Sequence, residues 1–149
     1  MQMVFDNQKV DLMPDDETIL GFSNRRYQYG YDNRIKVFID KVISIYIFPL
    51  PVYLATKLEA ITNRGMDDIR LSHDFEDVIF LIGNCSRIEL EIDQSQLMLK
   101  NYIAEVFRTL QKLANFKEAV LWSLSYGSDD SEVKRITEIT DRIAKWSPK

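Results

Sequence analysis

The chain has 149 residues, of which 46% are hydrophobic and 28% charged, a balance typical of one globular domain rather than of a disordered or fibrous protein. Its formal net charge of −4 argues against broad electrostatic binding to nucleic acid. A single cysteine, Cys85, and a single histidine, His73, exclude an internal disulfide and cysteine- or histidine-rich zinc sites, and they fit a reducing cytoplasm.

The sequence carries no signal for a membrane span or a secretory leader. The longest apolar run, "VISIYIFPLPVYLA" (42–55), contains two prolines and is shorter than the roughly 20 residues that a span needs. The opening "MQMVFDNQKVDLMP" lacks the basic-then-apolar order of a signal peptide. We therefore expect a single cytoplasmic domain over residues 1–149, without contact to a membrane.

The first fifty residues indicate a small β layer. Residues 3–13 alternate weakly and end before Pro14, which predicts one short strand with Asp11 near its end. Residues 14–24 follow as a loop that ends in Ser23 and Asn24, either of which suits a helix N-cap. Residues 24–34 predict a weak helix at best, because Gly30 lies in its middle.

The strongest β signal is residues 35–48, "IKVFIDKVISIYIF". Aliphatic side chains alternate with other residues on both sides of Asp40-Lys41, which predicts a hairpin with a two-residue turn there. Pro49 and Pro51 end the second strand, and Pro51 suits the first turn of a following helix.

The remaining chain predicts helices. One spans 52–64 with Gly65 as its C-cap. Another begins after Ser72 as N-cap and ends at Gly83. Further helices are expected over 95–113, 116–125 and 131–146. The fold class is therefore α+β: an antiparallel or mixed β layer (1–50), then a helical bundle (51–149). Its buried stripes are expected to be Phe75, Val78, Ile79 and Ile82; Leu99, Tyr102, Ile103, Val106, Phe107 and Leu110; and Val133, Ile136, Ile139 and Ile143.

Lys57 and Arg64 are the first candidate site residues. They lie seven residues apart on one helix, hence on the same side, with the small Ala60 between them. A lysine and an arginine so placed can clamp a phosphate or another anion. The spacing also fits an ordinary solvated face with Glu59 nearby, and spacing alone favours that simpler interpretation.

Asp74 and Asp77 lie three residues apart on the next predicted helix. Two carboxylates so placed can hold a hard cation such as Mg²⁺, or they can pair with Lys57. Asp74 also falls in the first helical turn, where the helix dipole favours an acid in any case. Helical periodicity does not distinguish between these interpretations. His73, in the same turn, is more often a surface residue or cap partner than a catalytic base.

Asp11 and a tyrosine set complete the candidates. An acid at a strand end is commonly a turn former, but it is also a position where active-site acids occur. Tyr27, Tyr29 and Tyr31 are able to stack a nucleobase, although their spacing around Gly30 equally suits an extended, half-exposed segment. The chain contains no Gly-rich phosphate loop, GxSxG or HExxH motif.

Four motifs together carry a family resemblance over approximately residues 8–110. In order and spacing they are similar to the nucleotidyltransferase-fold proteins of the AbiEii/AbiGii toxin-like group. The motifs are "KVDLMP", "ILGFSNRRY", "PVYLATKLEAITNRG" and "SHDFEDV".

The resemblance implies a fold like that of DNA polymerase β and transfer of a nucleoside monophosphate from a nucleoside triphosphate to a hydroxyl, assisted by Mg²⁺. By resemblance Asp11 would bind metal or activate the hydroxyl, and Lys57 would lie near the triphosphate. Asp74 would support that lysine or the substrate, with Arg64 and Asp77 beside them at the substrate.

One part of the family pattern has no place in this sequence. Only ten residues precede Asp11, so the family's glycine motif and D-x-D pair are missing, and we expect the chain to represent the C-terminal part of such a protein. Whether it is an enzyme stays open. The alternatives are a non-catalytic protein with a partner-binding helical surface, or one half of a split enzyme. An open sheet edge would favour a protein partner or self-association.

Overall fold

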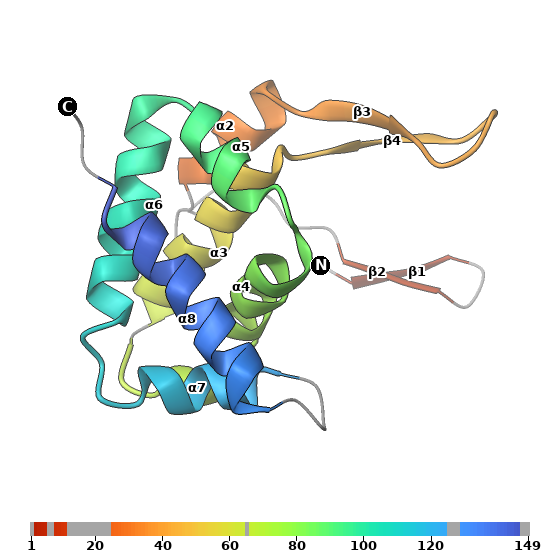
Figure 1. The fold of residues 1–149 in the computed structure, drawn as a ribbon. Coiled ribbons are helices and arrows are strands. Elements are labelled where there is room, and N and C mark those ends of the chain that lie inside the picture. The colour runs from red at the N-terminus through yellow and green to blue at the C-terminus, as the bar shows by residue number, and fades with distance from the viewer. Residues whose placement is uncertain (1, 6–7, 12–24, 65, 125–128, 147–149) are drawn as a thin grey trace.

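The computed structural model describes residues 2–5, 8–11, 25–64, 66–124 and 129–146, and for residues 2–5, 8–11 and 25 it describes the backbone alone. Seven α-helices and two β-hairpins make up this part of the chain (Figure 1). Their bounds are β1 Gln2–Phe5, β2 Gln8–Asp11, α2 Arg25–Asp32, β3 Ile35–Phe38, β4 Ser44–Ile47, α3 Leu50–Arg64, a short 3-10 helix Ile69–Leu71, α4 His73–Asn84, α5 Ile88–Gln94, α6 Leu97–Leu110, α7 Phe116–Trp122 and α8 Asp130–Ala144.

The α+β class is confirmed, but the predicted single β layer is wrong for the described residues. β1 pairs only with β2 and β3 only with β4, so the chain forms two separate antiparallel hairpins. The N-terminal strand is itself split in two, with Gln2 opposite Asp11 and Phe5 opposite Gln8. Between its halves the sequence places Asp6 and Asn7, residue types that favour turns. These two residues were the sequence signal for two strands rather than one.

The β3–β4 hairpin is confirmed, and its turn is longer than predicted. The Ile39 N–H donates to the Ile43 carbonyl at 2.9 Å, which leaves Asp40, Lys41 and Val42 as a three-residue loop. The Asp40 carboxylate accepts from the N–H groups of Val42 and Ile43 at 2.7 and 2.6 Å. This side chain closes the turn in place of the absent glycine.

The α2 helix is more regular than its glycine suggested. Gly30 is buried against the ring of Phe48, and the absence of a side chain at this position allows the ring to pack directly on the helix backbone. The predicted caps Ser23, Asn24 and Gly65 lie outside the described residues.

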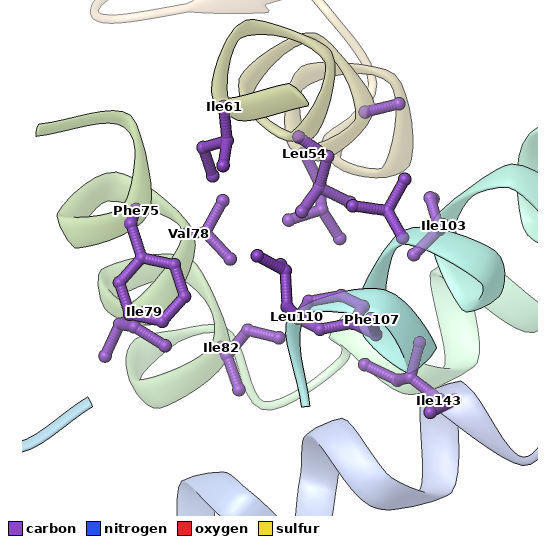
Figure 2. Close-up of a cluster of buried hydrophobic side chains, with 14 of the residues drawn as sticks. Leu54, Ile61, Phe75, Val78, Ile79, Ile82, Ile103, Phe107, Leu110 and Ile143 are labelled. Carbon is purple, nitrogen blue, oxygen red and sulfur yellow. The ribbon is translucent and has the colours of Figure 1, made fainter. Parts of the chain in front are cut away.

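The core lies between α3, α4, α6 and α8 (Figure 2). α3 contacts α2, α4, α5 and α6, while α8 crosses α4, α6 and α7. Ser72 caps α4 as predicted, since its hydroxyl accepts from the Phe75 N–H. That helix runs to Asn84, one residue past the predicted end at Gly83. The predicted stripes are buried, apart from Tyr102, Val133 and Ile139, which are half-buried.

None of the helices in the described ranges combines the length and the apolar character that crossing a membrane requires.

Candidate functional site

Lys57, Arg64, Asp74 and Asp77 meet where α3 packs on α4, and we call these four residues the α3–α4 charge cluster. α3 presents its two cations on one side because they are seven residues apart, and the first turn of α4 presents its two acids three residues apart. The structure therefore brings four of the five predicted site residues together.

Lys57 binds both carboxylates. Its Nζ lies 3.2 Å from Asp74 Oδ1 and 2.6 Å from Asp77 Oδ2. Burial of the ammonium acts to lower the pKa of Lys57, but the hydrogen bonds to Asp77 and Asp74 outweigh it, so the pKa is raised. Lys57 is therefore a fixed positive charge at neutral pH and is not a general base.

Asp74 bridges the two cations. It is only 7% exposed; one carboxylate oxygen accepts from Lys57, and the other accepts from Arg64 Nη1. A buried carboxylate requires such partners, and its position in the first turn of α4 adds the favourable helix dipole. Arg64 and Asp77 form the outer, solvent-facing side, with 65% and 48% of their side chains exposed.

Two tyrosines flank the cluster. The Lys57 ammonium lies 5.7 Å from the ring centroid of Tyr53, one helical turn earlier on α3. Burial raises the pKa of the Tyr27 phenol, which also lies in the fields of Lys57, Asp74 and Arg64. The sequence analysis missed Tyr53, although its i to i+4 spacing from Lys57 was a usable signal.

The tyrosine set of α2 does not form one stacking surface. In a helix, residues 27 and 31 share a side and residue 29 lies opposite. Tyr27 packs beside Phe48 with ring centroids 6.5 Å apart, whereas Tyr31 is exposed and stacks with Arg34 at 4.0 Å. The extended-segment interpretation is therefore wrong, and Tyr27 alone belongs to the site.

His73 is a surface residue. Its side chain is 94% exposed, and Nδ1 lies 2.9 Å from Glu76 Oε2. That hydrogen bond raises the pKa of His73. The side chain joins the first turn of α4 and makes no hydrogen bond to the charge cluster among the described residues.

Asp11 ends β2, and its side chain lies outside the described part of the structure, so its convergence on the cluster stays a prediction. Figure 1 shows the β1–β2 hairpin projecting from the helices. Within the described ranges no three His, Cys, Asp or Glu side chains are grouped to hold a metal ion. Asp74 and Asp77 are already paired with Lys57 and Arg64, so the described residues do not fit a Mg²⁺ site.

Comparisons with protein-family models, with curated proteins and with solved structures found no match to this chain. The resemblance to the AbiEii/AbiGii group therefore rests on the four sequence motifs.

Proposed function

We propose that this chain binds a nucleoside triphosphate at the α3–α4 charge cluster, as the phosphate-binding part of a nucleotidyltransferase-type site. The observation that carries the proposal is the Asp74 carboxylate, which holds Lys57 and Arg64 at one place. Two cations held by one buried acid are pre-organised, so little side-chain entropy is lost when an anion binds.

Both cations retain hydrogen-bond donors for a ligand. The Lys57 ammonium has three donors, and two described carboxylates accept from it. The Arg64 guanidinium has five donors, one of which reaches Asp74, on a side chain that is mostly exposed. The exposed ring of Tyr53 beside Lys57 supplies an aromatic surface for a base.

Asp77 is the group that opposes anion binding. The two cations and Asp74 carry a net charge of +1, and Asp77 cancels it. Because Asp77 is half exposed, a phosphate can displace it from Lys57, at the cost of that ion pair. The exposed acid thereby sets the anion affinity of the cluster.

Transfer of the nucleotide needs groups beyond those described. The Mg²⁺ implied by the resemblance has no three-acid site in the described ranges, so no chemical step is derived through it. Asp11, or carboxylates from another segment or chain, would have to complete the catalytic site. The split-enzyme alternative and the proposed phosphate site are therefore compatible.

Calorimetric titration with each nucleoside triphosphate, with and without Mg²⁺, tests the proposal. We expect Lys57→Ala to weaken binding by roughly 10- to 100-fold, the value of a charge-assisted hydrogen bond. Asp77→Asn is expected to strengthen binding by about tenfold, because a repelling charge is removed.

The matched control is Arg142→Ala, which removes an exposed arginine of α8 that forms an ion pair with Glu89 of α5 and should leave the affinity unchanged. Titration with inorganic triphosphate measures how much of the affinity comes from the phosphates without the base. Unchanged affinity in both Lys57→Ala and Asp77→Asn contradicts the proposal.

A second candidate function is a non-catalytic interaction protein. The cluster, with two cations and two acids, is also sufficient to clamp α3 to α4 without any ligand. What favours this candidate is a separate feature, the large aliphatic surface of the β3–β4 hairpin. Absence of nucleotide binding in the titration above would leave this candidate standing.

A further inference from the structure

One face of the β3–β4 hairpin is entirely aliphatic. Side chains alternate between the two faces of a strand, and the register pairs odd-numbered residues across the hairpin. The Ile39–Ile43 hydrogen bond extends this pairing to the turn. The face, called here the aliphatic face, consists of Ile35, Val37, Ile39, Ile43, Ile45 and Ile47.

The aliphatic face is uncovered by the described part of the chain. Its exposed fractions run from 36% at Val37 to 63% at Ile39, and Figure 1 shows the hairpin reaching away from the helices. A two-stranded hairpin is marginally stable in water on its own. Six exposed β-branched side chains side by side are typical of a contact surface.

The opposite face differs in chemistry. It carries Lys36, Phe38, Ser44 and Tyr46, and its cations lie over aromatic rings, Lys36 at 5.2 Å from Phe38 and Arg34 at 5.1 Å from Tyr46. This face is amphipathic and suits contact with water. Phe38 and Tyr46 are 66% and 61% exposed, but each ring contacts a cation, whereas the aliphatic face has no polar side chain. The aliphatic face is therefore the one that a partner is expected to cover.

The base of the aliphatic face opens into a cavity of about 470 Å³. Ile35 and Ile47 belong to both the face and the cavity, so the two surfaces are continuous. A cavity of this size accepts the side chains at the tip of another hairpin, where Val42 is 90% exposed. The remaining lining residues are Phe48, Leu50, Tyr53 and Glu91.

Opposite charges lie at the two ends of this surface. Lys41 is exposed at the tip, whereas the half-buried Glu91 lines the cavity at the base. Neither side chain forms an ion pair within the described ranges. The neighbouring Asp40 is held by the backbone N–H groups of the turn. A second hairpin placed with its tip over this base would bring its lysine toward Glu91.

We propose that two copies of this chain pack the aliphatic faces of their hairpins against each other, with the tip of each hairpin over the base of the other. The face is uncharged, so it matches a second copy of itself. The antiparallel arrangement around a two-fold axis satisfies Lys41 and Glu91 twice. The stretch from Ile35 to Ile39 spans roughly 13 Å at ~3.3 Å per residue, so the tip of an equal hairpin reaches the cavity.

Sedimentation equilibrium of the full chain tests the proposal. We expect a monomer–dimer equilibrium, and we expect Ile45→Lys, at the centre of the face, to raise the dimer dissociation constant by at least roughly 100-fold. The matched control is Ser44→Lys, the adjacent residue on the opposite face of the same strand, which should leave the dissociation constant unchanged. Far-ultraviolet circular dichroism and thermal melting check that both variants stay folded.

A charge exchange tests the antiparallel arrangement. Lys41→Glu and Glu91→Lys should each weaken the dimer several-fold, and the double variant should recover it. The proposal is overturned if the wild-type protein stays monomeric at about 0.1 mM, on the order of the concentrations at which weak dimers form. The aliphatic face would then be expected to bind a different protein. Equal loss in Ser44→Lys, larger oligomers, or a double variant without recovery overturns the face-to-face, tip-over-base dimer.

Discussion

At the residue scale, Asp74 decides what the charge cluster is able to do. Its two carboxylate oxygens accept hydrogen bonds from different cations, one from Lys57 and one from Arg64, so the side chain links two positions of α3 to the start of α4. The same contacts stabilise the helix pair and hold two cations in place for an anion. Structural and ligand-binding roles are therefore not exclusive here, and the exposed Asp77 is the residue whose removal separates them.

His73 gives a prediction that its uniqueness makes simple to measure. The hydrogen bond to Glu76 raises the pKa of His73 above its ordinary value of 6.5, so the folded state binds this proton more tightly than the unfolded state. The contribution to stability is fully present below pH 6.5 and is lost as the pH rises through the folded-state pKa. Proton NMR titration of the single imidazole should show the raised pKa.

The matching variants for His73 are Glu76→Gln and Glu138→Gln. The first removes the charged acceptor and should lower the pKa of His73 toward 6.5. The second changes an exposed glutamate on α8 and should not alter it. If the pKa of His73 is the same in Glu76→Gln as in the wild type, the hydrogen bond is not formed in solution.

The arrangement of the site residues was predictable from the sequence only within each helix. Helical spacing predicted that Lys57 and Arg64 share one side, and that Asp74 and Asp77 share another. Spacing within a helix does not say which helices pack together, because that depends on contacts between residues 10 to 20 positions apart in the sequence, such as Arg64 with Asp74 and Lys57 with Asp77. Pairing of Asp74 and Asp77 with Lys57 was one of two interpretations that periodicity left open, and the contacts in the structure decide for it. The place of Tyr27 beside the cluster depends on the folded arrangement of α2 against α3.

At the element scale, Gly30 and Gly83 look alike in sequence but differ in structure. A Cβ on Gly30 would lie 2.7 Å from two ring atoms of Phe48, whereas one on Gly83 would lie 3.5 Å from Ile136 Cδ1, an ordinary contact. We expect Gly30→Ala to lower the free energy of unfolding by about 1–3 kcal/mol, because the ring must shift. Gly83→Ala should raise it by up to about 1 kcal/mol through helix propensity.

Urea denaturation of the two alanine variants beside the wild type measures this difference. Each variant is the control for the other, since both place the same methyl group in a helix. A gain of stability in Gly30→Ala would mean that α2 and Phe48 separate easily in solution.

Elements were predictable where their pattern was local. The cap Ser72, the core stripes of α4 and α6 and the β3–β4 pairing all depend on neighbours within a few residues, and each is confirmed. The turn at Asp40 was wrong by one residue because its closing side-chain bonds replace the glycine that a two-residue turn prefers. That the hairpins stay separate depends on tertiary contacts and has no local signal.

At the scale of the whole molecule, the helical core and the β3–β4 hairpin differ in how their apolar side chains are buried. The helices bury a continuous cluster around Leu58, Phe75 and Phe107. The hairpin places its aliphatic residues outside that core. Tyr53 connects the two parts, because it lines the cavity at the hairpin base and also lies beside Lys57.

Acid should unfold the whole molecule through its surface carboxylates. The hydrogen bond from Arg70 lowers the pKa of Asp68 to about 2, and Arg142 lowers that of Glu89. A group with a lowered folded-state pKa contributes stability above its unfolded pKa and loses it as the pH falls through the folded value. We therefore expect stability to fall from about pH 5 to pH 2, where 19 Lys and Arg residues and one His remain charged and repel one another.

The measurement is the urea midpoint at a series of pH values from 7 to 2, at a protein concentration low enough to keep the chain monomeric, because dimerisation would add its own stability. Asp68→Asn should be less stable than the wild type at pH 7, and the difference should shrink as the pH falls toward 2, because the wild-type carboxyl is then protonated progressively and its ion pair with Arg70 weakens. A wild-type midpoint that stays level from pH 5 to pH 2.5 would show that these surface pairs are too well screened to matter, and that the buried helical core alone sets the stability.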